Sequence, residues 1–227
     1  MTPPDLSGCR LYGILDLAYV QPSEAQRVAA EMIEGGVDIL QLRAKKWSPA
    51  KISRIATNLH GLTSSAEVPL VINDHAEIAH EVSAEGVHVG QDDRSVAEVR
   101  EIAGPGCFVG KSTHSLEQAK QAAAEGADYI GFGPLFATPT KPDYVPIGLK
   151  EIGAVHAALD LPIFCIGGIK LENLANVIAA GARRVVIVSG LLQAADVAEY
   201  ARSAKALLNR KTCPERKPNG SSVENRK

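Results

Sequence analysis

Residues 116–132 read LEQAKQAAAEGADYIGF, and this stretch contains the unit from which the fold is predicted to be built. A segment rich in alanine and glutamate ends at Gly126, and an apolar run follows. Glycine ends helices because it takes the left-handed conformation at little steric cost. A glycine in a similar place recurs at Gly36, Gly86 and Gly181. The chain is therefore predicted to repeat a strand–helix unit.

Short apolar runs recur along nearly the whole chain, with helical segments between them. Their hydrophobicity is continuous rather than alternating, as expected of strands buried on both faces of a parallel sheet. About eight such units in roughly 210 residues favour an α/β fold, a single (β/α)8 or TIM barrel; a doubly wound open sheet is the alternative. The expected strands are residues 11–15, 38–42, 70–72, 86–89, 108–110, 129–132, 163–166 and 185–188. The expected helices include residues 24–34, 49–60, 94–103, 116–125, 149–159 and 171–180.

The composition is that of an ordinary globular protein. Of the 227 residues, 45% are hydrophobic and 22% are charged, and the formal net charge is −2. This balance gives no electrostatic reason to expect nucleic acid or an anionic membrane as a partner. Residues 1–210 are predicted to form one catalytic domain. The polar segment 211–227 is predicted to be a disordered tail, because it has too few apolar residues to form a core.

Cysteine usage and the N-terminal sequence bear on the compartment. The four cysteines are widely spaced and form no Cys-x-x-Cys pair, and residues 1–10 contain no apolar segment. A reduced, cytoplasmic protein without a signal peptide is therefore expected. A homo-oligomer is compatible with the sequence.

Polar residues follow most of the expected strands, at the end of the barrel where TIM-barrel enzymes place their active sites. Asp74 follows the third strand and Asp93 the fourth, so their carboxylates are expected above the same part of the barrel. Paired carboxylates suit Mg²⁺, which takes its other ligands from water and phosphate oxygens. The alternative is that the two aspartates cap helices.

Other residues at this end indicate a phosphorylated ligand. Arg43, Lys45 and Lys141 are cations that can clamp a pyrophosphate. The turns at Gly167-Gly168 and Val188-Ser189-Gly190 follow the last two strands, where TIM barrels commonly bind phosphate through backbone N–H groups. These turns predict the ligand class but no particular reaction.

Several motifs, taken in order, resemble those of the thiamine-phosphate synthases. The phrases HVGQDD, residues 88–93, and Thr-Pro-Thr-Lys, residues 138–141, are the most specific, and the resemblance covers residues 11–208. The other motifs are Gln41-Leu42-Arg43-x-Lys45, Ile72-Asn73-Asp74, Gly110-Lys111-Ser112, Gly131-Phe132-Gly133-Pro134 and Ile166-Gly167-Gly168-Ile169.

The resemblance implies a transferase of thiamine biosynthesis. It would join 4-amino-2-methyl-5-(diphosphooxymethyl)pyrimidine to thiazole phosphate, or to its carboxylate, and release thiamine phosphate and pyrophosphate. The implied reaction is dissociative and Mg²⁺-assisted: pyrophosphate leaves first, and the thiazole nitrogen then attacks the pyrimidine methylene cation. Since the departing pyrophosphate gathers negative charge, Mg²⁺ and nearby cations would stabilise the transition state, and no nucleophilic side chain is needed.

The resemblance also implies roles for individual residues. Asp74 and Asp93 would hold Mg²⁺, and Arg43, Lys45, Ser112 and Lys141 would be catalytic. The residues implied to surround the pyrimidine diphosphate are Gln41, Arg43, Lys45, Asn73, Ser112 and Lys141. Those implied to hold the thiazole phosphate are Thr138, Thr140, Gly168, Val188 and Ser189. Leu42, Ala44 and Pro139 are also expected to bind substrate.

Three other functions are compatible with parts of the sequence. The phrase GKSTHS, residues 110–115, also resembles the related thiazole tautomerases, in which a histidine near this place moves protons, so that His114 would be a general acid or base; a capping role is its alternative. Those isomerases usually lack the two aspartates. A non-catalytic ligand-binding barrel, or another enzyme for phosphate esters, would not need the aspartate pair together with Lys45 and Lys141.

Overall fold

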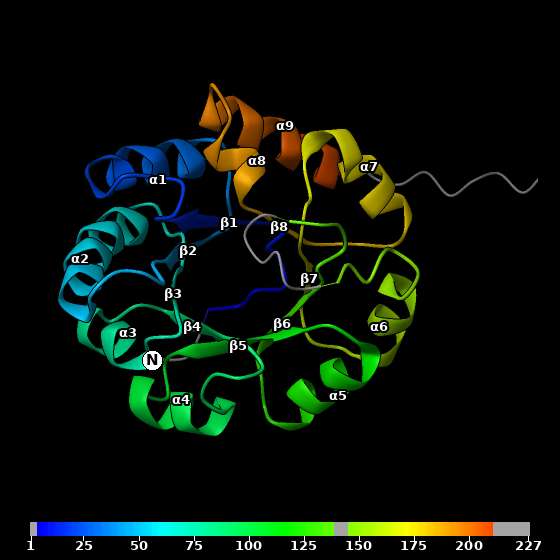
Figure 1. Cartoon of the computed structure of the whole chain (residues 1–227), viewed down its shortest axis with the longest axis horizontal. Helices are drawn as coiled ribbons and strands as arrows, with labels where there is room; N and C mark the ends of the chain where they lie inside the picture. Colours follow the sequence, from blue (N-terminus) through cyan, green and yellow to red (C-terminus); the bar gives the residue numbers. More distant parts are fainter. Residues whose placement is uncertain (1–3, 139–144, 211–227) are drawn as a thin grey trace, which may run out of the picture.

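The structure is a computed structural model that describes residues 4–138 and 145–210. The strands form a closed parallel barrel in which each strand pairs with the next and β8 pairs with β1, so the predicted TIM barrel is confirmed (Figure 1). All eight lie within a few residues of the expected ranges. They are β1 (Leu11–Asp16), β2 (Ile39–Arg43), β3 (Leu70–Asn73), β4 (Gly86–Val89), β5 (Phe108–Thr113), β6 (Tyr129–Phe132), β7 (Ile163–Cys165) and β8 (Val185–Ile187).

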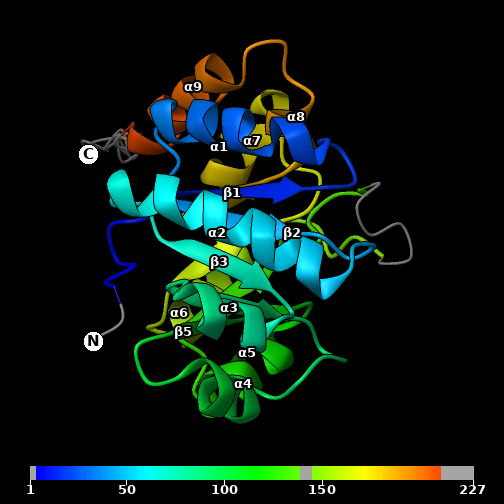
Figure 2. The same cartoon turned by 90° about the vertical axis from the view of Figure 1, so that its left-hand side faces the viewer.

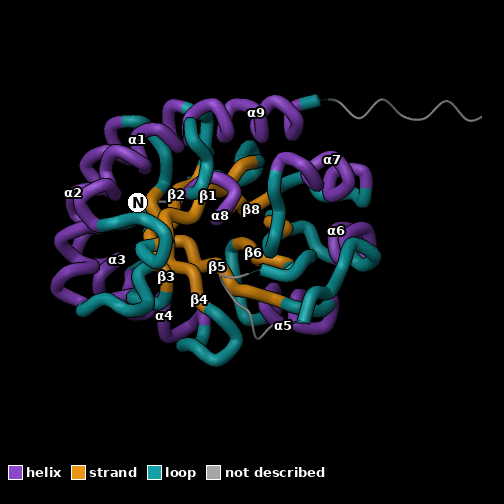
Figure 3. Tube along the Cα trace, turned by 45° about the horizontal axis from the view of Figure 1, so that its top comes forward, coloured by secondary structure: helices purple, strands orange, loops and turns teal. Residues whose placement is uncertain are grey.

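Helices form the outer layer around the strands (Figures 1 and 2). The last helix, α9, packs against α1, α7 and α8 and so covers the place where β8 meets β1 (Figure 3). The helical elements are η1 (Pro22–Glu24), α1 (Ala25–Glu34), α2 (Pro49–Ser65), α3 (Ala76–Val82), α4 (Val96–Ala103), α5 (Leu116–Ala124), α6 (Ile152–Ala158), α7 (Leu171–Ala179), α8 (Ser189–Leu192) and α9 (Val197–Asn209). Within the described ranges, no helix has the length and apolar character needed to cross a membrane.

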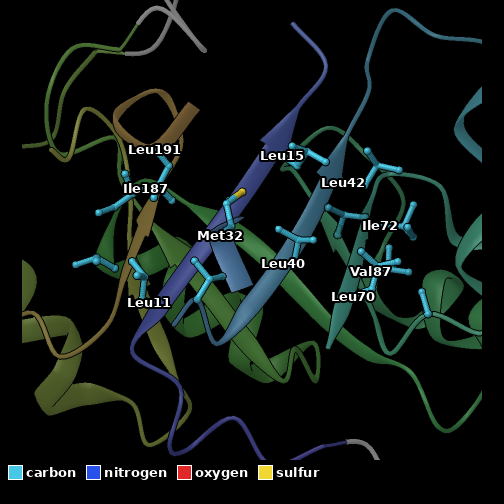
Figure 4. Packing of buried hydrophobic residues seen from close by; sticks show 14 of the residues in the cluster. Leu11, Leu15, Met32, Leu40, Leu42, Leu70, Ile72, Val87, Ile187 and Leu191 are labelled. Atoms are coloured by element: carbon cyan, nitrogen blue, oxygen red, sulfur yellow. The ribbon is translucent and has the colours of Figure 1, made fainter. Parts of the chain in front are cut away.

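The strands are buried on both faces, which explains their continuous hydrophobicity. Successive side chains of a strand point to opposite faces. One set packs outward against the helices, as Leu11, Leu40 and Leu70 do (Figure 4). The other set fills the barrel. This inner cluster consists of Tyr12, Ile14, Ile39, Val71, Phe108, Tyr129, Phe164 and Val186, with Leu6 from the segment before β1.

The glycines at the ends of helices behave as predicted in three places out of four. Gly36, Gly126 and Gly181 have φ values of 90°, 84° and 105°. The prediction for Gly86 is wrong, because α3 ends at Val82 and the left-handed residue that follows it is Ser83, with φ 59°. Gly86 lies within β4, and a Cβ there would stand 2.3 Å from the Phe108 ring. The glycine is therefore required by packing inside the barrel.

Candidate active site

A pocket lies at the carboxyl ends of the strands, where the sequence predicts the site. Its walls come from strands and loops all around the barrel, so residues far apart in sequence meet there. Among the predicted site residues, those that line the pocket are Gln41, Arg43, Asn73, Ser112, Thr138, Gly168, Val188 and Ser189. Pro139, Thr140 and Lys141 lie outside the described residues, as does the tail 211–227.

Arg43 ends β2 at the edge of the pocket, and Asp16 fixes its position. The Arg43 Nη1 atom lies 2.5 Å from Asp16 Oδ2. Asp16 is almost fully buried and also accepts the Ala18 N–H at 2.9 Å through its other oxygen. Sequence reasoning missed Asp16, although a carboxylate as the last residue of a strand is a usable signal in this fold. The ion pair holds the guanidinium at the mouth.

Lys45, Asp74 and Asp93 form a second charged group. Lys45 Nζ lies 2.7 Å from Asp74 Oδ2, and Asp93 Oδ2 accepts the Gly90 N–H at 2.7 Å. Burial raises the pKa of Asp74; the ion pair with Lys45 opposes this, and the charge of Asp93 adds to it. The two carboxylates are therefore close enough to repel each other, as predicted from their positions after neighbouring strands.

Neither aspartate caps a helix, so the capping alternative does not account for them. The N-cap of α3 is His75, and that of α4 is Ser95, which forms a capping box with Glu98. Within the described ranges no group of three or more Asp, Glu, His or Cys side chains could hold a metal. Two repelling carboxylates, with no third Asp, Glu, His or Cys grouped with them in the described part of the chain, fit Mg²⁺, which keeps several waters and takes other oxygens from substrate phosphates.

Ser112 and Lys111 point to opposite sides of β5. The strand extends to Thr113, three residues beyond the predicted end. Lys111 faces the helices and lies 2.7 Å from Glu125, so it is no part of the pocket. Ser112 faces inward, and its Oγ lies 2.9 Å from His88 Nε2. His88 also lines the pocket, although it was not predicted as a site residue from the sequence.

His114 lines the same pocket. Its Nδ1 lies 2.5 Å from the main-chain oxygen of Gly133, and its backbone N–H donates to Gln118. The cap of α5 is Ser115, whose side chain accepts from the Gln118 N–H. His114 is thus not the capping residue, and its ring is oriented by the loop after β6.

The two turns after β7 and β8 form another wall of the pocket. Gly167 and Gly168 have φ values of 99° and 64°. A Cβ on Gly168 would lie 2.7 Å from Phe136 Cβ, and the Gly168 oxygen accepts from Asn173 at 2.9 Å. Glycine is therefore needed for the turn to pack against the segment that leads to Thr138. Val188 and Ser189 lie at the start of α8.

Two predicted substrate-binding residues point elsewhere. Leu42 is buried in the outer core between strands and helices, because it alternates with the inward-facing Gln41. Ala44 lines a neighbouring pocket together with Lys45 and Trp47. Lys51 Nζ lies over the Trp47 ring, 5.1 Å from its centroid. Trp47 therefore packs on the rim of the barrel. Any contact from Leu42 to a ligand would have to come from its main chain.

A TIM barrel whose pocket carries an arginine and a glycine turn, with a lysine and a carboxylate pair beside it at the same end of the barrel, has the features of an enzyme that acts on small phosphorylated molecules. Comparisons with known proteins define it further. Residues 11–191 match the family described as thiamine monophosphate synthase. The chain belongs to this thiamine-phosphate synthase family, and is thus a transferase of thiamine biosynthesis.

Individual relatives agree with this assignment. A thiamine-phosphate synthase of Halalkalibacterium halodurans is 42% identical over 189 residues, which are 83% of this chain and 90% of that protein. One of Chloroflexus aurantiacus is 42% identical and covers 88% and 93%. The solved thiamine phosphate pyrophosphorylase of Pyrococcus furiosus superposes with a TM-score of 0.80 at 29% identity, over 88% of this chain and 95% of that one.

Proposed function

We propose that the pocket joins 4-amino-2-methyl-5-(diphosphooxymethyl)pyrimidine to thiazole phosphate, with pyrophosphate as the leaving group. The observation that carries this proposal is the carboxylate pair of Asp74 and Asp93 beside Lys45, with Arg43 at the same mouth. Such a set suits a diphosphate and its cation better than a neutral ligand.

The diphosphate is proposed to lie over β2, β3 and β4. Asp74 and Asp93 would hold Mg²⁺, which supplies positive charge to the departing pyrophosphate. Arg43, fixed by Asp16, and Lys45 would bind the phosphate oxygens and stabilise the charge that grows on them as the bond breaks. Asn73, Ser112, and Lys141 from outside the described residues are proposed to complete this part of the site.

The thiazole phosphate is proposed to lie against the other wall, at Thr138, Gly168, Val188 and Ser189. Thr140 is proposed to join them. Backbone N–H groups near strand ends are good donors to a phosphate. This placement brings the thiazole ring toward the centre of the pocket, where its nitrogen can meet the pyrimidine methylene carbon.

The reaction needs no nucleophilic side chain, and the two cysteines of the barrel core are unsuited to be one. Cys107 and Cys165 are buried, and burial raises the pKa of each thiol to about 12. They therefore stay protonated and pack as small apolar groups. Free, buried thiols support the cytoplasmic location proposed for the chain.

The residue assignments are tested by neutralising one lysine at a time. We expect Lys45→Gln to lower kcat/KM for the pyrimidine diphosphate by at least ~100-fold, because a charge-assisted contact to the leaving group is lost. The KM for the thiazole phosphate should change little. The matched control is Lys46→Gln, one residue away. Equal losses in the two variants would contradict the assignment.

A further inference from the structure

A row of hydrogen bonds crosses the barrel beneath the pocket. Gln41 Nε2 donates to Tyr12 Oη at 2.6 Å, and the hydroxyls of Tyr12 and Tyr129 are 3.0 Å apart. Tyr129 Oη lies 2.9 Å from His88 Nδ1, and His88 Nε2 lies 2.9 Å from Ser112 Oγ. These five side chains are called the interior chain. Its ends, Gln41 on β2 and Ser112 on β5, both line the pocket.

The middle of the interior chain has no access to water. Tyr12 and Tyr129 are 1% and 0% exposed, and the Phe164 ring packs edge-on against both, with centroids 5.4 and 5.6 Å away. Burial raises the pKa of both tyrosines, so both hydroxyls keep their protons. A buried hydroxyl hydrogen without an acceptor is costly, and each of these hydrogens must therefore point at a neighbour in the chain.

Once the orientation of the Gln41 amide is given, this requirement fixes the direction of every hydrogen bond in the interior chain. Since Gln41 donates to Tyr12, the Tyr12 hydrogen must go to Tyr129, the one further acceptor that the described residues offer it. The Tyr129 hydrogen must then go to His88 Nδ1. His88 consequently carries its proton on Nε2 and donates to Ser112. The Ser112 hydrogen is left to point into the pocket.

The opposite direction is also self-consistent, but a mixture is not. If the Gln41 oxygen faced Tyr12 and all the hydrogen bonds were kept, every bond would reverse. His88 would then carry its proton on Nδ1, and Ser112 would donate its hydrogen to His88 Nε2. A mixed order either leaves a buried hydroxyl hydrogen without an acceptor, or leaves the two tyrosine oxygens 3.0 Å apart with no hydrogen between them. The orientation of the Gln41 amide and the donor role of Ser112 are therefore coupled across the barrel.

We propose that Tyr12, Tyr129 and His88 are positioning residues that hold the Gln41 oxygen ready for an amino group and Ser112 as a donor, which makes the site select 4-amino over 4-oxo pyrimidines. This inference rests on the proposed function. A 4-aminopyrimidine offers an amino donor to the Gln41 oxygen and a ring nitrogen to its free N–H. A 4-oxopyrimidine offers a carbonyl oxygen and a ring N–H instead. To match these groups, the Gln41 amide would have to turn over and the hydrogen bonds of the interior chain would reverse. The Ser112 hydrogen would then point at His88 and no longer into the pocket.

The first test needs no ligand. Nitrogen-15 NMR of histidine-labelled protein distinguishes the two imidazole tautomers, and the spectrum of His88→Gln identifies the His88 signals. We expect the His88 proton on Nε2, with Nδ1 accepting from Tyr129. Tyr129→Phe removes the donor to Nδ1 and should change this single tautomer into a mixture. In Tyr12→Phe the Tyr129 hydrogen still has His88 Nδ1 as its acceptor, so the tautomer should stay the same. Phe164→Leu, which loosens the same packing but keeps both hydroxyls, should leave it unchanged.

The second test measures dissociation constants for 4-amino-2-methyl-5-hydroxymethylpyrimidine monophosphate and its 4-oxo counterpart. We expect the wild type to prefer the amino ligand and this preference to fall roughly tenfold in Tyr12→Phe, the worth of about one hydrogen bond. Phe164→Leu should keep the wild-type ratio. Thermal unfolding confirms that each variant is folded. If Tyr129→Phe does not fold, the wild-type tautomer and the ligand ratio in Tyr12→Phe still test the proposal.

The outcomes separate this inference from the proposed function. An Nδ1-protonated His88 in the wild type, or an unchanged tautomer in Tyr129→Phe, overturns the coupled chain. An unchanged ligand ratio in Tyr12→Phe overturns its role in selection. If neither pyrimidine binds the wild type, the substrate assignment is wrong, while the tautomer still decides whether the chain is coupled.

Discussion

Single side chains at the mouth of the barrel are held in place by partners that differ in kind. Asp16 holds Arg43 by an ion pair, Asp74 holds Lys45, and the backbone N–H of Gly90 holds Asp93. The positions of Arg43, Lys45 and the two aspartates after their strands could be predicted, because polar residues at strand ends stand out in the sequence. Their partners were not predicted: Asp16 was missed although it ends β1, and the Gly90 contact could not be foreseen, since a main-chain N–H carries no sequence signal.

The first prediction concerns Asp93→Asn. Asparagine can still accept the Gly90 N–H, and it removes the repulsion that Asp93 exerts on Asp74. We expect the unfolding temperature of the metal-free protein to stay the same or rise by about 1–2 °C. Added Mg²⁺ with pyrophosphate should stabilise the wild type by mass action but not the variant. The control is the neighbouring Asp92→Asn, and an equal response of all three proteins would exclude the metal site.

The second prediction concerns pH and His156 on α6. Its Nε2 is buried without a hydrogen-bond partner among the described residues, and burial, helped by Arg183 and Arg184, lowers its pKa from 6.5 to about 4. Between these values the unfolded chain binds a proton that the folded protein does not. The free energy of unfolding should therefore fall as the pH drops from 6.5 toward 4.

Urea unfolding of the wild type and of His156→Gln, at pH 7 and at pH 5, checks this expectation. The loss of stability between the two pH values should be smaller in the variant, because its side chain does not titrate. An identical loss in both proteins would mean that His156 is protonated to the same extent in the folded and unfolded states.

At the scale of elements, the strands could be predicted from the sequence. Which of their side chains point into the barrel and which point toward the helices could not. Continuous hydrophobicity marks a strand that is buried on both faces, but for the same reason it does not show which residues point into the barrel. Ending the fifth strand at residue 110 hid the alternation that sends Lys111 outward and Ser112 inward. The length of α2, which continues past Gly61, was missed because a glycine does not always end a helix.

The third prediction compares two glycine substitutions. Gly110 lies in β5, and a Cβ there would stand 2.0 Å from Tyr129 Cζ, so Gly110→Ala should destabilise the protein by about 1–3 kcal/mol through overpacking. Gly153 lies in α6 with nothing within 4 Å of its Cβ position, and Gly153→Ala should stabilise by about 0.5–1 kcal/mol. Denaturant unfolding measures both; a neutral Gly110→Ala would show that β5 has room for a methyl group.

At the scale of the whole molecule, repetition made the fold predictable. Eight apolar runs with helices between them close into one barrel, and closure brings the carboxyl ends of all strands to one rim. Residues as distant as Arg43 and Ser189 thereby share a pocket. Contacts across the inside of the barrel, such as Tyr12 with Tyr129, have no such signal, because they join strands that are not neighbours in the sheet.

The most direct measurement is the formation of thiamine phosphate from the pyrimidine diphosphate and thiazole phosphate, with and without Mg²⁺, by the wild type and by Asp93→Ala. The account predicts product from the wild type only when Mg²⁺ is present, and a rate at least ~100-fold lower in the variant. Full activity in a chelator, or an unchanged rate in Asp93→Ala, would contradict the carboxylate-held metal site. No product under any condition would contradict the proposed reaction itself.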